Sequence, residues 1–357
     1  MLGDLGADVV KVEPPTGDAL RQVGIAPDGT ATAWALTGRH KRSAVIDTTT
    51  AAGLGDLAAL TGVADIVVTN QSERLLRAWK CSYTDIAARN PRAIVVSLTA
   101  FGTTGPRAGQ PGNGSIAEAF SGFAQLNGAR SGPPTLPSLA LGDSLAAVSA
   151  LNAVLAALYW RDAAGGNGQF IDASIFEPLV AVMASSLAAW DTATAPPMRS
   201  GSRISNAAPR NVYRTADHRW IAISGPTDPQ VDRILSIIAV TDATLRARYA
   251  NAQTRVGPIA DELDQLVADW VAAHQLQAVE DALTVANIPH AAVNSFDDLL
   301  RDEHVQYRST VLPLPNAPRR MFANAIAPLS QTPARAPRPA PTVGEHTDDV
   351  LREWLAR

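Results

Sequence analysis

The chain has 357 residues, of which 46% are hydrophobic and 18% charged, a composition typical of a folded protein with about two domains. Its formal net charge of −4 favours neither a nucleic acid nor an anionic membrane surface as a partner. The single cysteine, Cys81, excludes an internal disulfide, and we expect it to be a buried, unreactive thiol.

No basic segment followed by an apolar stretch opens the sequence, so no signal peptide is visible. The longest apolar run, 145–160, is interrupted by Ser149 and Asn152 and is shorter than the roughly 20 residues that cross a bilayer. We therefore expect a cytoplasmic protein without a membrane span.

The N-terminal half repeats a helix–turn–strand pattern. Glycines at positions 6 and 62 are suited to end helices, and β-branched runs follow them. Strands that are apolar on both faces and alternate with helices indicate a parallel sheet covered on both sides. The predicted strands are Val9–Glu13, Ile66–Val68, Ala93–Leu98 and Gln169–Ala173.

Two loops rich in glycine and proline, 102–114 and 131–137, precede a long apolar helix that begins near residue 141. Gly165–Gly168 follows this helix and precedes a strand. A phosphate-binding loop would precede a helix, so we interpret this glycine-rich stretch as a helix end and turn.

A polar, proline-containing linker near 191–211 follows the N-terminal half and leads into a second block, 205–300. This block contains a hairpin with its turn at 216–218, several helices and a strand near 290–293. We expect a large α/β domain from 1–190 plus 311–357, and a smaller α+β domain from 205–300. The proline-rich tail 311–342 is predicted to be extended, and a final helix begins with Thr347 as its N-cap.

Asp143 opens the long helix in the stretch LGDSLAAVSALNAVLAAL. An acidic residue here is typical of an N-cap, which accepts a hydrogen bond from a first-turn N–H group. Alternatively, the helix dipole would lower the pKa of the carboxyl group and keep a nucleophile ionised. The local pattern leaves both interpretations open.

Several stretches, in this order, resemble family III CoA-transferases, the group of formyl-CoA transferase, carnitine CoA-transferase and α-methylacyl-CoA racemase. They are DLGADVVKVEPPTGD, HKRSAVID with His40 in place of the usual Asn, NPRAIVVSLTAFGTTGP, GNGQFIDASIFE, VYRTADHRWIAI, IPHAAVNSFDDLL and GEHTDDVL. Each stretch alone is a weak signal, whereas their shared order over the whole chain is a strong one.

The resemblance implies a Rossmann-like large domain and two chains interlocked in a homodimer. It implies transfer of CoA from an acyl-CoA donor to a small carboxylic acid, with Asp143 as the covalent nucleophile and no permanently bound cofactor. A carboxylate that attacks a thioester passes through an oxyanion, and glycine-rich 102–114 is the candidate source of backbone N–H donors.

The positions that match CoA contacts of the family are less complete. Asn70 matches a strand-end Asn, but the Phe and Gly-Pro-Gly that usually follow it are replaced by Gln71-Ser72-Glu73-Arg74. Ile46 matches an apolar position beside the adenine. Lys41, Arg42 and Arg77 are candidates for the CoA phosphates, or else form a solvated basic face.

Two alternatives remain. A racemase of this family takes one proton-transferring group from a Gly-His-Asp stretch, but Asn113 and Gly114 occupy the matching positions here. Histidines occur only at 40, 218, 274, 290, 304 and 346, without metal-ligand spacing. The other alternative is a non-catalytic or incomplete family member, because the sequence begins after the position of the first strand of the family.

Overall fold

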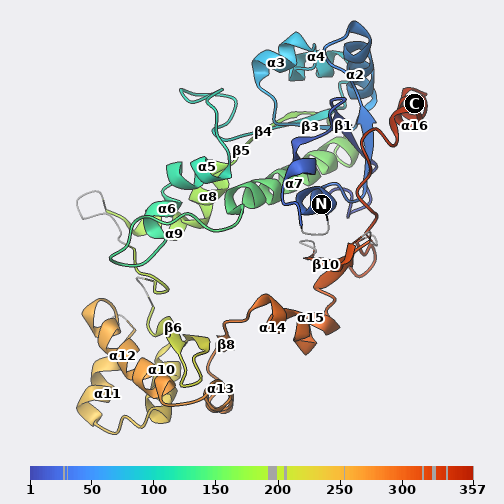
Figure 1. The fold of residues 1–357 in the computed structure, drawn as a ribbon. Coiled ribbons are helices and arrows are strands. Elements are labelled where there is room, and N and C mark those ends of the chain that lie inside the picture. Colours follow the sequence, from blue (N-terminus) through green and yellow to red (C-terminus); the bar gives the residue numbers. More distant parts are fainter. Residues whose placement is uncertain are drawn as a thin grey trace. The chain divides into compact units, whose positions relative to one another are not determined.

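The computed structural model describes residues 1–26, 29, 31–191, 199–204, 207–252, 254–315, 317–323, 327–334 and 337–356, with the backbone alone at 317–320. The chain divides into two compact units (Figure 1). The first comprises Met1–Phe123, Pro137–Leu187 and Glu303–Arg357, and the second comprises Ala124–Leu136 and Ala188–Asp302. Residues 124–136 thus belong to the second unit.

Parallel strands form the centre of the first unit. β1 (Val9–Glu13) pairs with β2 (Lys41–Val45), while β3 (Ile66–Thr69), β4 (Ile94–Thr99) and β5 (Phe170–Ser174) form a sheet in that order. The predicted strands are confirmed with small differences in bounds. Instead of the single predicted sheet there are two, and among the described strands β1 pairs only with β2 and β3 only with β4.

Helices follow most strands of the first unit. They are η1 (Ala19–Gln22), α1 (Thr32–Thr37), α2 (Ala51–Val63), α3 (Glu73–Ala78), α4 (Tyr83–Arg89), α5 (Gly114–Phe120), α7 (Leu141–Asp162), α8 (Phe176–Val182), α15 (Glu303–Tyr307) and α16 (Thr347–Leu355). Two short helices, α6 (Phe123–Leu126) and α9 (Ala184–Ala189), span unit boundaries. The unit is therefore mixed α/β.

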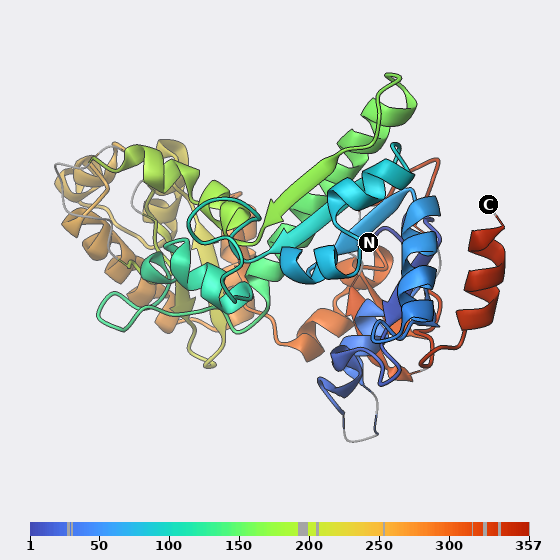
Figure 2. The same cartoon turned by 90° about the horizontal axis from the view of Figure 1, so that it is seen from above.

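Helix α7 packs along β4 and β5, as Figure 2 shows. Its Ala150 and Val154 are buried against Val96 of β4. With 22 residues, α7 is long and apolar enough to cross a membrane by length and composition, so the expectation that this stretch is too short was wrong. Its packing on the sheet accounts for only part of the apolar composition, because 28% of the apolar window is buried in this structure.

The C-terminal segment returns to the first unit. Val350 of α16 is fully buried in a cluster with Ala44 and Cys81. The N-cap of α16 is His346 and not Thr347, contrary to the sequence prediction. The hydroxyl group of Thr347 instead accepts a hydrogen bond from the backbone N–H of Val45 at 3.0 Å. The prediction of a buried Cys81 is confirmed, and burial raises the pKa of its thiol.

Part of the tail before α16, which the sequence predicted to be extended, forms paired strands. β9 (Val311–Leu314) and β10 (Ala317–Ala323) form an antiparallel hairpin. Prolines within this stretch suggested a structureless segment. In a two-stranded sheet each strand keeps a free edge, where a residue without an N–H, such as Pro313, is tolerated.

The second unit is α+β. β6 (Arg210–Arg214), β7 (Trp220–Ser224) and β8 (His290–Ala292) form an antiparallel sheet. The predicted hairpin turn is confirmed, with His218 at a φ of 64°. The helices are α10 (Asp228–Ile237), α11 (Ala243–Tyr249), α12 (Pro258–Ala272), α13 (Leu276–Val285) and α14 (Phe296–Arg301). Apolar residues of β7 and α12 form its main core.

Candidate active site

Asp143 lies in the first turn of α7 but does not cap that helix. The N-cap is Ala140, whose methyl side chain cannot accept a hydrogen bond. The carboxylate of Asp143 instead faces α5, where the backbone N–H of Gly114 donates to it. The N-cap interpretation is therefore wrong, and the carboxylate is held by the start of a neighbouring helix.

The contact between Asp143 and Gly114 is close. A Cβ placed on Gly114 would lie 2.5 Å from Oδ2 and 3.2 Å from Oδ1 of Asp143. The first distance is too short for non-bonded atoms and the second is tight, so any larger residue at position 114 would require the Asp143 carboxylate to move. Asp143 itself is exposed, which leaves the carboxylate within reach of a reagent.

A second carboxylate lies beside the first. Glu118 of α5 is buried, and its Oε1 accepts a hydrogen bond from the backbone N–H of Gly142 at 2.9 Å. It takes one of the first-turn N–H groups that an N-cap would otherwise satisfy. Ala117 and Ala146 fill the apolar space around these polar groups together with Ile175 and Leu179.

The environment raises the pKa of the Asp143 carboxyl group above its ordinary value of 3.8. Partial burial is the main cause, and the negative charge of Glu118 adds to it, whereas the Gly114 N–H acts in the opposite direction. The expectation of a lowered pKa was wrong, because it considered the dipole of α7 without the neighbouring carboxylate and the loss of water.

The glycine-rich loop between β4 and α5 is anchored to the sheet. The carboxylate of Asp172 in β5 accepts hydrogen bonds from the backbone N–H of Thr103, at 2.9 and 3.0 Å, and from its hydroxyl group at 2.6 Å. Gly102 has a φ of +85°, a conformation that other residues seldom adopt. The turn thus directs the chain toward the start of α5.

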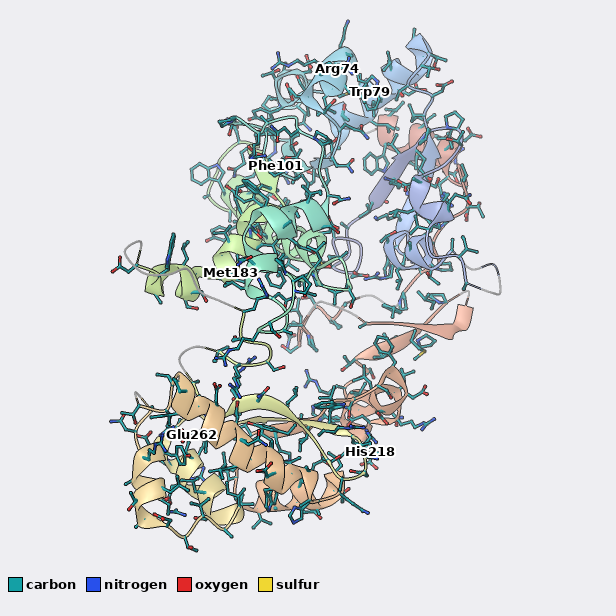
Figure 3. The ribbon with its side chains drawn as sticks, turned by 60° about the vertical axis from the view of Figure 1, so that its left-hand side comes forward. Arg74, Trp79, Phe101, Met183, His218 and Glu262 are labelled. Atoms are coloured by element: carbon teal, nitrogen blue, oxygen red, sulfur yellow. The ribbon has the colours of Figure 1, made fainter. Side chains whose placement is uncertain are left out.

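Aromatic rings support the same loop. Phe101, labelled in Figure 3, packs edge-to-face on Phe120 of α5 at 5.1 Å between ring centroids. The Arg107 guanidinium lies over both rings, 4.7 Å from the Phe120 centroid and 5.6 Å from that of Phe101. The start and the middle of the loop therefore contact α5, the helix that faces Asp143.

Sequence reasoning identified Asp143 but missed Glu118 and Asp172. A charged residue in the otherwise apolar stretch IAEAF was the available signal for Glu118. Asp172 likewise follows two apolar residues in the strand FIDAS, but neither pattern identifies the hydrogen-bond partner. These assignments depend on three-dimensional contacts.

Ile46 and Asn70 lie after the carboxyl ends of β2 and β3, the ends at which ligands bind in parallel α/β sheets. Asn70 is exposed, whereas Ile46 is only 3% exposed and packs in an apolar cluster. A CoA contact at either residue stays a prediction.

The basic candidates lie elsewhere on the first unit. Lys41 and Arg42 begin β2, at the opposite end of that strand from Ile46. The guanidinium of Arg42 is held by Asp8 and Glu353, each at 2.7 Å. Arg77 is exposed on α3 and pairs with Glu73 at 2.8 Å. A phosphate would have to compete with these carboxylates for both arginines.

Within the part of the chain that the structure describes, no group of three or more His, Cys, Asp or Glu side chains is placed to hold a metal ion.

Comparison with known proteins agrees with the resemblance. Residues 1–347 match the model of CoA-transferase family III. The chain is 32% identical to succinyl-CoA–D-citramalate CoA-transferase of Chloroflexus aurantiacus, covering 99% of this chain and 89% of that protein. It is 31% identical to succinate–glutarate CoA-transferase of Agrobacterium fabrum, with 99% and 90% covered.

The fold is also similar to a solved structure. A CAIB/BAIF family protein from Brucella suis superposes with a TM-score of 0.84 at 26% identity, covering 99% of this chain and 93% of that one. The likeness extends over both units, so it supports the fold of each.

Proposed function

Because the chain belongs to CoA-transferase family III and is an enzyme of the CoA-transferase type, we propose that it moves coenzyme A from an acyl-CoA donor to a carboxylic acid through a covalent intermediate on Asp143. The observation that carries the proposal is the partly buried carboxylate of Asp143, on a residue that stays accessible to solvent, faced by the Gly114 N–H at the start of α5.

In the first half of the reaction, a carboxylate oxygen of Asp143 attacks the thioester carbonyl carbon and the C–S bond breaks. CoA leaves as a thiolate, and a mixed anhydride remains. The thiolate then attacks the aspartyl carbonyl carbon. This step releases the donor acid as a carboxylate and leaves CoA on Asp143 as a thioester.

In the second half, the acceptor carboxylate attacks the aspartyl thioester, expels the CoA thiolate and forms a new anhydride. The thiolate attacks the carbonyl carbon that came from the acceptor, and the Asp143 carboxylate is regenerated. Every step forms an oxyanion, so a backbone N–H near the reacting carbon would stabilise it by several kcal/mol. Gly114 is the best-placed donor.

Both named relatives act on succinyl-CoA or succinate. Succinyl-CoA is therefore the donor to assay first, with small dicarboxylic acids as acceptors. CoA acts as a substrate, for which Asn70, Ile46, Lys41, Arg42 and Arg77 are the proposed contacts.

We place the protein in the cytoplasm as an interlocked homodimer, with no nucleic acid or membrane partner. Sedimentation at decreasing protein concentration tests the assembly. Interlocked chains would remain a dimer on dilution, whereas a stable monomer would contradict this arrangement.

The covalent step is tested by incubating the enzyme with succinyl-CoA and then with hydroxylamine. Hydroxylamine converts an activated aspartyl carbonyl to a hydroxamate, and peptide mass spectrometry locates it. We expect modification at Asp143 that requires the acyl-CoA. An unmodified Asp143 during turnover would contradict the mechanism, and exchange of the α-proton of a 2-methylacyl-CoA in deuterated water would favour the racemase alternative.

A further inference from the structure

Glu118 is an acidic residue in an unusual position. Its side chain is only 1% exposed, and it lies one helical turn after Gly114 on the face of α5 that packs against α7. Burial of a carboxylate costs free energy unless the charge is compensated. A carboxylate buried at that cost is a candidate for a role that needs its charge.

The hydrogen bond of Glu118 fixes the start of α7. Its Oε1 accepts from the Gly142 N–H at 2.9 Å, immediately before Asp143. Gly142 is also tightly enclosed, since an added Cβ would lie 3.2 Å from the carbonyl oxygen of Gly114. Two residues of α5, one turn apart, thus hold two consecutive residues of α7.

The negative charge of Glu118 also acts on Asp143. It contributes to the raised pKa of the Asp143 carboxyl group, as burial does. A more basic carboxylate is a stronger nucleophile once it is ionised. The hydrogen bond between Glu118 and the Gly142 N–H therefore positions Asp143, and the negative charge of Glu118 makes the Asp143 carboxylate more basic.

Other charged groups on the packed elements have their own partners. On α8, Glu177 bonds the Ser174 hydroxyl, and on β5, Asp172 bonds Thr103. In the loop, Arg107 lies over aromatic rings and donates to Gln110. Of these acids, Glu118 is the one whose charge raises the pKa of Asp143.

We propose that Glu118 is a positioning residue for the acyl-transfer reaction, which holds the first turn of α7 through Gly142 and places a negative charge beside Asp143. This inference rests on the proposed function of Asp143 as the nucleophile. A purely structural role would need the acceptor oxygen but not the charge, because a neutral amide oxygen accepts the same hydrogen bond.

The substitutions Glu118→Gln and Glu118→Ala separate these roles. Gln keeps an acceptor for Gly142 and removes the charge, so Glu118→Gln should fold as the wild type does. Its kcat should fall several-fold, and the acidic limb of its pH–rate profile should move to lower pH. Glu118→Ala removes both the hydrogen-bond acceptor of Gly142 and the negative charge. Because the first turn of α7 then loses its support and Asp143 is misplaced, kcat should fall by roughly a hundredfold.

A matched control is Glu177→Gln, which removes an exposed carboxylate from α8 and should leave both kcat and the pH profile unchanged. The Michaelis constant for succinyl-CoA should change little in all variants, because Glu118 acts on the nucleophile rather than on the bound CoA. Wild-type kcat and an unmoved pH profile in Glu118→Gln would overturn the proposal.

A second measurement does not depend on turnover. Carbon-13 NMR of aspartate-labelled enzyme follows the Asp143 carboxyl titration, with the resonance assigned by its absence in Asp143→Asn. We expect a lower midpoint in Glu118→Gln than in the wild type, and an equal midpoint would contradict the coupling. If the wild type lacked CoA transfer while the midpoints differed, the proposed function would fail and the contact would stand.

Discussion

Gly114 and Asp143 form a backbone-to-carboxylate contact in which any side chain at position 114 would collide with the nucleophile candidate. An added Cβ would lie 2.9 Å from Cγ and 2.5 Å from Oδ2 of Asp143. Gly114 is the first residue of α5 and does not have a positive φ, so alanine is compatible with its backbone. A larger residue at this position is thus opposed by the neighbouring Asp143 side chain and not by the backbone conformation.

Gly114→Ala should therefore displace the Asp143 carboxylate while the fold is retained. We expect CoA transfer to fall by roughly a hundredfold, the loss typical of a reacting group displaced by about 1 Å. Thermal unfolding and initial rates with succinyl-CoA measure the two effects separately.

The control is Gly55→Ala in α2, where an added Cβ meets nothing within 4 Å. Alanine is favoured over glycine in a helix interior by about 1 kcal/mol, so this variant should be slightly more stable and fully active. Wild-type activity in Gly114→Ala would show that the contact is not part of the reaction geometry.

Asp143→Asn should abolish acyl transfer, since an amide is not a nucleophile toward a thioester. The same variant should be more stable than the wild type near neutral pH. The folded pKa of Asp143 is raised above 3.8, so its stabilising contribution is present below the unfolded pKa and is lost as pH rises through the folded pKa.

The pH dependence of the unfolding temperature tests whether Asp143→Asn is indeed more stable than the wild type near neutral pH. Unfolding temperatures of the wild type and Asp143→Asn should differ most near neutrality and converge as the buffer approaches the ordinary carboxyl pKa of 3.8. A variant that is less stable than the wild type at neutral pH would mean that the carboxylate stabilises the fold. Retained transferase activity would remove Asp143 from the mechanism.

Local sequence patterns predicted the strands well because each strand carries its own signal. Val9–Glu13 was predicted with its observed bounds, since a β-branched run ends at two prolines that cannot continue it. The hairpin around His218 was likewise predicted from turn residues between two apolar stretches. Such features depend on neighbours in sequence and not on distant contacts.

The site was predicted less completely because its geometry depends on contacts between separate elements. Asp143 was found by its place at a helix start, but the direction of its carboxylate is set by α5, nearly thirty residues earlier in the chain. The sign of its pKa shift was wrong for the same reason, since the partial burial of the carboxylate and the approach of Glu118 arise only when the two helices pack. The division of the strands into two sheets likewise depends on which strands pair with each other, and no local sequence pattern indicates that pairing.

The anchor of the glycine-rich loop gives another prediction. Asp172→Ala removes the acceptor of both the backbone N–H and the hydroxyl group of Thr103. The loop would then lose its anchor on β5 and keep only its aromatic contacts, and we expect transfer activity to fall by roughly tenfold with little change in unfolding temperature. Asp56→Ala in α2, a helix that packs on α4 and α16, is the control and should retain activity. Equal activity of the two variants would exclude the anchor from catalysis.

Glu13 provides the opposite pH dependence to Asp143. It is 1% exposed and accepts hydrogen bonds from Nε and Nη2 of Arg21, at 2.8 and 2.7 Å, and from the Ser43 hydroxyl at 2.6 Å. Burial by itself would raise the pKa of this carboxyl group, but these hydrogen bonds outweigh it and hold the pKa below 4.5. Its stabilisation is therefore present above the unfolded pKa and is lost as pH falls through the folded pKa.

Glu13→Gln should consequently destabilise the first unit by about 3 kcal/mol at neutral pH, because the Arg21 charge loses its buried partner. The variant should also lose less stability than the wild type when the buffer is acidified below pH 4.5, the ordinary pKa of the group. Urea unfolding at both pH values measures the difference. Glu73→Gln, which breaks the exposed pair with Arg77, should cost less than about 1 kcal/mol at either pH. If the two substitutions were equally mild, the hydrogen bonds around Glu13 would contribute no more than a surface ion pair.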